Sequence, residues 1–277
     1  MKKIDRLGWA AGISFVSHGV RVGVRVNRPE ALALVQDYFP PGWKPTRAPV
    51  VERLYSLILG QGDEAVRGAR RFSLFYRDLA RLARTKDTAE ALALFESDLH
   101  LHVATEARRR VFVHAGVVGW KGRALLVPGR SLSGKTTLVA ELVRAGATYY
   151  SDEYAVLDAH GRVHPYPRPL QIRAGETGRQ SRHAVETLGG RAGRRPLPIA
   201  LVVLAHYRPG AKWRPRSLSA GRGVLELLAQ TVSARNQPER AFAALQEVAK
   251  RALILKGARG EAAELVGRLL QRLEERG

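Results

Sequence analysis

A phosphate-binding loop is the clearest chemical signal in the sequence. Within the segment GRSLSGKTT, Gly129, Gly134, Lys135 and Thr136 match the pattern G-x-x-x-x-G-K-[ST]. Glycines let backbone N–H groups curl around an anion, and a helix that starts there adds unpaired donors and the positive end of its dipole. In this pattern the lysine reaches the β- and γ-phosphates of ATP, and the threonine hydroxyl binds Mg²⁺. The expected nucleotide-binding residues are Gly129, Arg130, Ser131, Leu132, Ser133, Gly134, Lys135, Thr136 and Thr137.

The flanking residues predict the elements that must position this loop. The apolar run 124–127 predicts a buried strand, and the apolar spacing over 138–143 predicts one face of a helix. Gly146 is placed to end that helix, and residues 147–151 predict a second strand. The alternative is a flexible Gly/Ser turn before an ordinary helix. A strand, a glycine loop and a helix in this order favour the nucleotide site.

Two adjacent carboxylates, Asp152 and Glu153, follow the second strand. A helix of about 11 residues runs ~16 Å away from the phosphates, and a strand of about five residues returns as far. A right-handed crossover makes the two strands parallel, so both acids should end near the loop. One carboxylate could then ligate Mg²⁺ while the other accepts a proton from an attacking hydroxyl. The alternative is that Asp152 caps a turn and Glu153 faces solvent.

Around the loop, the sequence resembles the catalytic domain of HPr kinase/phosphorylase, a bacterial protein-serine kinase related in fold to phosphoenolpyruvate carboxykinase. The resemblance rests on a histidine–glycine strand, the loop itself, and a strand that ends in adjacent acids. The residues that carry it are 113–118, 129–137, 150–153 and 167–173. It implies an α/β fold: a P-loop kinase domain of the HPr kinase / phosphoenolpyruvate carboxykinase type over residues 111–277. The sequence pattern over 1–110 indicates a separate, smaller N-terminal α+β part, which is a candidate for substrate or partner binding.

In that family the adjacent acids serve as catalytic base and as Mg²⁺ carboxylates, and the histidine lies in the active site. Carried over by position, these residues are Asp152, Glu153 and His114, which join Lys135 as the expected catalytic residues. The expected metal ligands are Thr136 and Asp152. For His114, the alternative is a core histidine bonded to the backbone.

The sequence also departs from the family pattern. Glu153 stands where the family has a second aspartate, Gln171 stands where it has a glutamate, and residues 174–176 replace its Gly-Leu-Gly loop. These changes leave ATP binding in place but count against the reverse, phosphorylase reaction and against HPr as substrate. The chain is more similar to divergent HPr-kinase-like proteins associated with bacterial peptide-modification gene clusters, in which the acceptor is a serine of a small peptide or an unidentified compound.

The expected function is therefore an ATP- and Mg²⁺-dependent kinase that acts on a hydroxyl, with a serine of a peptide or small protein as the acceptor. The alternatives are a small-molecule kinase, an ATPase, and a nucleotide-binding regulator without transfer activity. Two arginines, Arg168 and Arg173, are candidate substrate contacts. Because they lie five residues apart, a regular strand would point them to opposite faces, so only one should meet the phosphoryl group. We favour Arg173, which follows the Leu-x-Ile stretch shared with the family; the alternative is that both are exposed.

Composition limits the remaining possibilities. With 45% hydrophobic residues in 277, the chain can bury a sizeable core. It has no cysteine and no run of 18 apolar residues, and Asp5 interrupts a faint likeness to a signal peptide, so we expect a cytoplasmic protein without membrane contact. The net charge of +21 is dispersed rather than gathered in a basic block, and no nucleic-acid-binding signature is present. An acidic acceptor is therefore a better expectation than nucleic acid, and a homo-oligomer stays open.

Outside the motif region, periodicity predicts further elements. The expected strands are 13–16, 19–26 and 200–205, and the expected helices are 29–38, 88–105, 223–234, 237–255 and 261–276. Residues 51–59 fit either a strand or a buried helix. His100 and His102 lack a third ligand in the sequence, which favours core or surface histidines over a metal site. The Gly/Arg-rich segment 189–195 is expected to form a loop, either over the acceptor site or inert.

Overall fold

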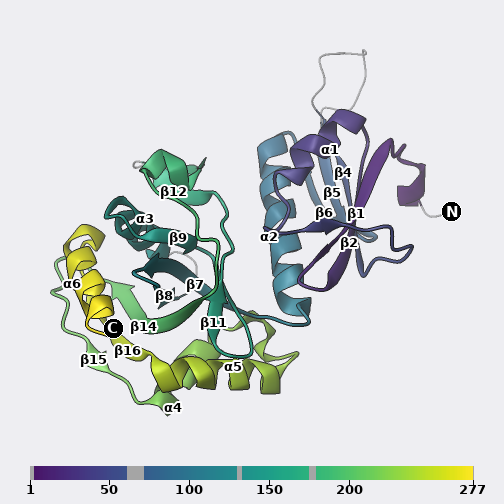
Figure 1. Cartoon of the computed structure of the whole chain (residues 1–277). Coiled ribbons are helices and arrows are strands. Elements are labelled where there is room, and N and C mark those ends of the chain that lie inside the picture. Colours follow the sequence, from purple (N-terminus) through teal and green to yellow (C-terminus); the bar gives the residue numbers. More distant parts are fainter. Residues whose placement is uncertain (1–2, 61–71, 130–132, 175–178, 277) are drawn as a thin grey trace. The chain divides into compact units, whose positions relative to one another are not determined.

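The computed structural model describes residues 3–60, 72–129, 133–174 and 179–276, and its fold is mixed α/β (Figure 1). The chain divides into two compact units, Met1–Arg108 and Arg109–Gly277. Among the helices of the described ranges, none is both long and apolar enough to cross a membrane.

The first unit is a mixed sheet with two helices. Its strands are β1 (Ala11–Ser17), β2 (Val20–Val26), β3 (Lys44–Pro45), β4 (Arg53–Ile58), β5 (Ser73–Arg77) and β6 (Ala80–Thr85), and its helices are α1 (Pro29–Gln36) and α2 (Thr88–Glu106). The strand order is β3-β1-β2-β4-β5-β6. The segment 51–59, which fits a strand or a buried helix by sequence, forms β4, because its apolar side chains fill the core between the sheet and α2. Five aromatic rings, those of Phe15, Phe39, Tyr55, Phe75 and Phe95, lie at the centre of this core.

His100 and His102 both lie on α2, so these two residues do not share a face. His100 is buried, and its Nε2 donates a hydrogen bond to the Tyr38 carbonyl at 3.1 Å. No cluster of three or more His, Asp or Glu side chains that could hold a metal ion occurs in the described part of the chain. His100 is therefore a core histidine, in line with the sequence expectation.

The second unit is a larger sheet with helices on both faces. Its strands are β7 (Val111–Trp120), β8 (Arg123–Pro128), β9 (Thr148–Ser151), β10 (Tyr154–Leu157), β11 (Arg162–His164), β14 (Leu197–Tyr207), β15 (Arg216–Ser217) and β16 (Leu253–Arg259), with β12 (Leu170–Ala174) and β13 (Arg179–His183) as a separate hairpin. Its helices are α3 (Lys135–Arg144), α4 (Ala220–Leu228), α5 (Pro238–Arg251) and α6 (Ala262–Glu274). The order across the sheet is β11-β10-β7-β8-β14-β16-β15, and β9 also pairs with β7.

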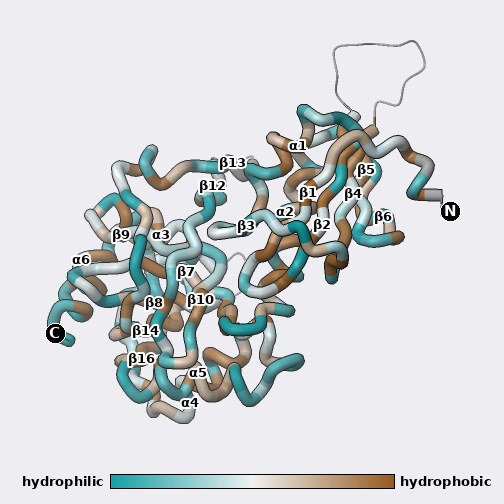
Figure 2. Tube along the Cα trace, turned by 45° about the vertical axis from the view of Figure 1, so that its right-hand side comes forward, coloured by the Kyte–Doolittle hydropathy of each residue, from teal (hydrophilic) through white to brown (hydrophobic). Residues whose placement is uncertain are grey.

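Successive side chains of the central strands point to opposite faces of the sheet. Because apolar residues occupy both sets of positions, helices cover both faces. On β8, Leu125 and Val127 face the core formed with α3 and α6, whereas Leu126 faces the core formed with α4 and α5. A strand buried on both faces reads as a continuous apolar run, which is what residues 124–127 show. Figure 2 shows hydrophobic residues along β8 and β14, at the centre of this sheet. The result is a three-layer arrangement that holds the carboxyl ends of β8, β14 and β16, which run in parallel, along one edge.

The structure corrects two expectations for the second unit. The helix expected over 237–255 ends at Arg251, and Leu253–Arg259 forms β16, which pairs with β14 in parallel. A short apolar run suits a helix or a strand equally, and here pairing within the sheet decides. The helix expected over 223–234 is α4 followed by the 3-10 turn Val232–Ala234. Segment 189–195 forms the expected loop, and the backbone of Arg191 and Gly193 hydrogen-bonds to the backbone of Tyr149 on β9.

Candidate active site

The candidate phosphate loop is fixed at its base by the hairpin of β7 and β8. Lys121 and Gly122 form the two-residue turn, with positive φ angles of 45° and 80°. The pairing of Ala115 with Pro128 then brings the start of the loop to β7, where the Gly129 N–H donates to the His114 carbonyl at 3.1 Å. This confirms the expected strands over 113–118 and 124–127, which form a hairpin before the loop. It also places His114 directly beside the loop.

The expected lysine lies at the first position of α3. Lys135 is buried, with 7% of its surface exposed, and its Nζ donates to the Gly129 carbonyl at 2.7 Å, across the loop. Burial lowers the pKa of Lys135 below its usual value, although Glu153 and Asp152 act in the opposite direction. The Lys135 amine therefore lies inside the loop, with Glu153 and Asp152 near enough to act on its charge. In the sequence pattern, this lysine is the group that contacts the β- and γ-phosphates.

Two further features of the loop fit a phosphate group. The Ser133 Oγ is buried and has no hydrogen-bond partner among the described residues. A Cβ added at Gly129 would lie 2.8 Å from that hydroxyl oxygen, so only glycine leaves the space open. Buried hydroxyls usually find a partner, and a phosphate oxygen is a suitable one. Arg130, Ser131 and Leu132, which were also expected here, lie outside the described residues, and Thr137 is exposed.

The helix end and the next strand bring the acids back to the loop. Gly146 has a φ of 96°, its N–H donates to Val143 and that of Ala147 donates to Leu142, which is a Schellman end of α3. Strand β9 then pairs antiparallel with β7, as β8 does, so β8 and β9 point the same way. The predicted return of the chain to the loop, along a strand that runs the same way as β8, is confirmed. Strand β7 lies between β8 and β9.

The acidic pair occupies an interruption within a strand. The register along β7 runs from Val117, opposite Ser151, to His114, opposite Tyr154, so β10 continues the line of β9. Between β9 and β10, the Ser151 hydroxyl accepts hydrogen bonds from the N–H groups of Glu153 (3.2 Å) and Tyr154 (3.0 Å). Asp152 and Glu153 are therefore held by a rigid strand on either side. The sequence placed them at a strand end and did not predict β10.

Asp152 is the more buried of the two acids, at 5% exposure. Its Oδ2 accepts from the Thr136 hydroxyl at 3.2 Å, and its Oδ1 contacts the Tyr149 hydroxyl at 2.9 Å. The Tyr149 hydroxyl also donates to the Arg168 carbonyl at 2.8 Å. One phenol has one proton, so the Tyr149 hydroxyl can donate fully to only one of these two acceptors. Burial raises the pKa of Asp152, against the lowering effects of Tyr149 and Arg168.

Glu153 lies on the more open side, next to His114. The two side chains are 37% and 32% exposed, and His114 Nδ1 lies 3.6 Å from Glu153 Oε1, an ion-pair distance. Burial raises the pKa of Glu153, but His114, Arg168 and Lys135 together outweigh burial and lower that pKa. The imidazole stacks at a tilt on Tyr154, with 4.9 Å between ring centroids. His114 is therefore in contact with the acidic pair rather than enclosed in the core.

The two candidate arginines have different positions. Arg168 lies near both acids, because its charge lowers the pKa of Asp152 and of Glu153 and its carbonyl accepts from Tyr149. Arg173 lies in β12, and its side chain falls outside the described residues. The preference for Arg173 therefore stays an expectation, whereas Arg168 is in place beside the acids.

Sequence reasoning missed a second cation at the loop, Arg259. It is 3% exposed at the carboxyl end of β16, and its Nη2 donates to the carbonyl of Gly134 at 2.9 Å. Its Nη1 donates to Gly260 at 2.9 Å, and its guanidinium lies 5.3 Å from the ring centroid of Tyr207. A Cβ on Gly134, whose φ is 79°, would collide with this guanidinium. Only the pairing of β16 with β14 reveals Arg259, and that strand was assigned to a helix.

A comparison with protein-family models and with curated proteins finds no match. Among solved structures, the chain is similar to the Hpr(Ser) kinase/phosphatase from Coxiella burnetii, with 14% sequence identity and a TM-score of 0.37. The alignment covers 60% of this chain and 99% of that chain. At this level of similarity, we infer function from the geometry of the site and from the sequence motifs.

Proposed function

We propose that this protein is an ATP- and Mg²⁺-dependent kinase that transfers the γ-phosphate to a hydroxyl, with a serine of a peptide or small protein as the acceptor. One observation carries the proposal: the buried Lys135 spans the glycine loop while the adjacent Thr136 contacts Asp152 at 3.2 Å. This arrangement joins a phosphate-binding loop, an oxygen pair suited to a metal and a second carboxylate within a few residues. The sequence resemblance to HPr kinase/phosphorylase supports the same assignment.

The loop residues bind the nucleotide. A phosphate oxygen takes the place of the Gly129 carbonyl on Lys135 Nζ and gives the Ser133 hydroxyl the partner that it lacks among the described residues. The first N–H groups of α3 point toward the same anion, because they have no partners within the helix. Arg259 donates a hydrogen bond to the Gly134 carbonyl and adds a permanent positive charge next to the loop.

The oxygen pair of Thr136 and Asp152 fits Mg²⁺. Neighbouring ligands of an octahedral Mg²⁺ lie about 3 Å apart, given metal–oxygen distances of 2.0–2.1 Å, and these two oxygens are 3.2 Å apart. Magnesium sites in kinases use one or two protein oxygens together with phosphate and water, so no larger cluster of acids is needed. When bound, the ion neutralises charge that develops on the phosphate oxygens.

Glu153 positions and deprotonates the acceptor. Its carboxylate is partly exposed, whereas Asp152 is buried against Thr136 and Tyr149, so an incoming hydroxyl reaches Glu153 first. The acceptor oxygen forms a bond to the γ-phosphorus, the bond to the ADP oxygen breaks, and the hydroxyl proton passes to Glu153. Glu153 can accept this proton although its pKa is lowered, because phosphoryl transfer depends mainly on positioning and charge stabilisation. His114 orients Glu153, and Arg168 offsets the charge of both acids.

The acceptor class follows from charge and from the sequence resemblance. A net charge of +21 attracts acidic partners and speeds their encounter without fixing affinity. A short acidic peptide encoded beside this gene, with a serine or threonine, is therefore the acceptor to test, in a cytoplasmic setting.

The deciding experiment is mass spectrometry of such a peptide after incubation with ATP and Mg²⁺. We expect a mass gain of one phosphate with the wild-type protein and none with Lys135→Ala. Lys121→Ala is the matched control, since Lys121 is 64% exposed on the same unit and should leave the mass gain intact. Equal transfer by Lys135→Ala would overturn the proposal.

Other results would point to the alternatives. Phosphorylation of a free hydroxylated metabolite but not of the peptide would indicate a small-molecule kinase. Rapid ATP hydrolysis without any acceptor would indicate an ATPase, and binding of ATP without turnover would indicate a regulator.

A further inference from the structure

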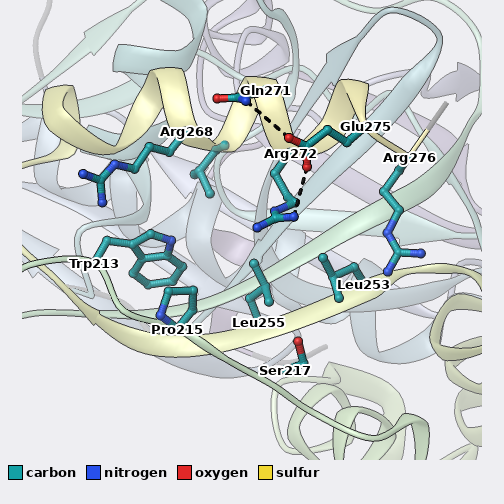
Figure 3. A pocket seen from close by; sticks show the side chains of 11 residues that line it. Trp213, Pro215, Ser217, Leu253, Leu255, Arg268, Gln271, Arg272, Glu275 and Arg276 are labelled. Atoms are coloured by element: carbon teal, nitrogen blue, oxygen red, sulfur yellow. Dashed lines mark hydrogen bonds and ion pairs between the residues drawn. The ribbon is translucent and has the colours of Figure 1, made fainter.

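A pocket lies elsewhere in the same unit, between α6 and the β15–β16 edge of the sheet. It has a volume of about 700 Å³. Leu253 and Leu255 of β16 form its apolar floor, and Trp213 and Pro215 form one wall (Figure 3). Pockets of this size suit a small ligand or a few residues of a peptide. We propose that this pocket binds an extended acidic peptide.

The opposite wall carries a row of arginines. Arg268 and Arg272 lie one turn apart on α6, and Arg276 follows four residues later, just beyond the helix end (Figure 3). The carboxylate among the lining residues is Glu275, which accepts from Arg272 at 3.0 Å and from Gln271 at 3.3 Å. Three arginines against one glutamate leave this wall positive, so the ligand must be anionic.

The spacing of these arginines favours a peptide over other anions. Residues four apart on a helix are about 6 Å apart along its axis. Alternate side chains of an extended peptide repeat at about 6.6 Å, which nearly matches that spacing. Acidic side chains at every second position can therefore meet successive arginines, while the residues between them face the aromatic and aliphatic wall. The aliphatic surface of Leu253, Leu255 and Pro215 suits the apolar side chains of a peptide better than the charged backbone of a nucleic acid.

The pocket is separate from the candidate active site. Arg259, which contacts the loop, lies at the carboxyl end of β16, whereas Leu255 and Leu253 lie four and six residues earlier. At about 3.3 Å per residue, the pocket floor is roughly 13–20 Å from Arg259 along the strand. Binding here can therefore be measured without ATP, and the inference does not rest on the proposed kinase activity.

The test is fluorescence anisotropy with a labelled seven-residue peptide that alternates glutamate with leucine, added to the full chain. The triple substitution Arg268→Gln, Arg272→Gln and Arg276→Gln should weaken binding at least about 10-fold. Trp213→Ala should weaken it about 5-fold, because aromatic anchors carry much of the binding energy. Glu275→Gln should tighten binding about twofold, since it frees Arg272 from an internal competitor.

A matched control separates this site from general attraction to a basic protein. Arg222, Arg235 and Arg240 are exposed on other elements, and changing all three to glutamine removes the same charge. That variant should bind the peptide within about twofold of wild type. An equal loss in both triple variants would overturn the inference. So would equal binding of a peptide with glutamine in place of glutamate, or tighter binding of a single-stranded oligonucleotide with the same dependence on these arginines.

Discussion

Each unit contains a buried tyrosine that contacts an aspartate, and the two pairs differ in their surroundings. In the first unit, the Tyr55 hydroxyl donates to Asp98 Oδ1 at 2.9 Å, and Arg77 donates to Asp98 Oδ2 at 2.9 Å. In the second unit, the Tyr149 hydroxyl contacts Asp152 Oδ1 at the same distance of 2.9 Å, and the Thr136 hydroxyl contacts Oδ2.

The difference lies in how the negative charge is compensated. Asp98 is 19% exposed and has an ion-pair partner on Arg77, so its charge is stabilised in place. Asp152 is more buried, and burial raises its pKa against the lowering effects of Tyr149 and Arg168. Under the proposed function, the same pair of residue types serves structure in one unit and metal binding in the other. Local contact geometry alone does not separate the two cases, whereas charge compensation does.

The largest expected effect comes from Asp152→Asn. It removes the charged oxygen that faces Thr136, so ATP-dependent transfer should fall at least about 100-fold. The same change should stabilise the second unit at neutral pH. The folded-state pKa of Asp152 is raised above its unfolded value of 3.8, so the wild-type fold loses stability as pH rises from there through the folded pKa. Asparagine does not ionise and avoids that loss.

The counterpart substitution, Asp98→Asn, should do the opposite. It breaks the ion pair with Arg77 and should cost about 1 kcal/mol of stability while leaving transfer unchanged. Hydrogen exchange, resolved by unit, measures both stabilities. A stability loss on Asp152→Asn at pH 7, equal to that of Asp98→Asn, would contradict the distinction between the two pairs.

The elements around the loop were predictable because their signals are local. The strand at 124–127, the glycine loop, the helix and its end at Gly146 each follow from residues that lie close together in the sequence. The position of Asp152 beside Thr136 followed from the lengths of the helix and strand between them. The local sequence pattern is enough to predict a site that is formed by one short strand–helix–strand crossover.

Other parts of the site depend on pairing between distant segments. The contact of Arg259 with Gly134 requires β16 to lie parallel to β14, and the apolar run 253–255 suited a helix as well as a strand. The continuation of β9 into β10 needs the partner strand β7, whose register the sequence does not reveal. The candidate role of His114 came from the family resemblance, and the structure places its ring beside Glu153.

The next effect in size concerns the cation below the loop. Arg259→Met removes the hydrogen bond to Gly134 and a positive charge, so ATP affinity should fall about 10- to 30-fold, as expected for bonds that involve a charged group. Arg77→Met, the matched change in the first unit, should lower stability and leave ATP affinity unchanged. Isothermal titration with ATP–Mg²⁺ measures both. Unchanged affinity in Arg259→Met would assign this arginine to packing alone.

A smaller effect distinguishes the two tyrosines. The hydrogen bond from Tyr149 lowers the pKa of Asp152, so Tyr149→Phe should raise that pKa further. If transfer requires ionised Asp152, the acid limb of the kcat/KM profile should move to higher pH, with a loss of about 3- to 10-fold at pH values on that limb. Tyr55→Phe should leave the pH profile in place and lower the stability of the first unit by about 1 kcal/mol. Identical pH profiles for wild type and Tyr149→Phe would remove Asp152 from the titrating step.

The smallest expected effect compares the two histidines. His114 meets Glu153 at 3.6 Å with both side chains partly exposed, so His114→Gln should lower kcat about two- to fivefold and leave ATP affinity nearly unchanged. His100 is buried and donates to the Tyr38 carbonyl, so His100→Gln should lower stability by about 1 kcal/mol without changing kcat. Steady-state kinetics and thermal unfolding of both variants give the comparison. If His114→Gln loses stability but not turnover, the imidazole is structural. Glu153 is then held by the charges of Arg168 and Lys135 and by its backbone bond to Ser151.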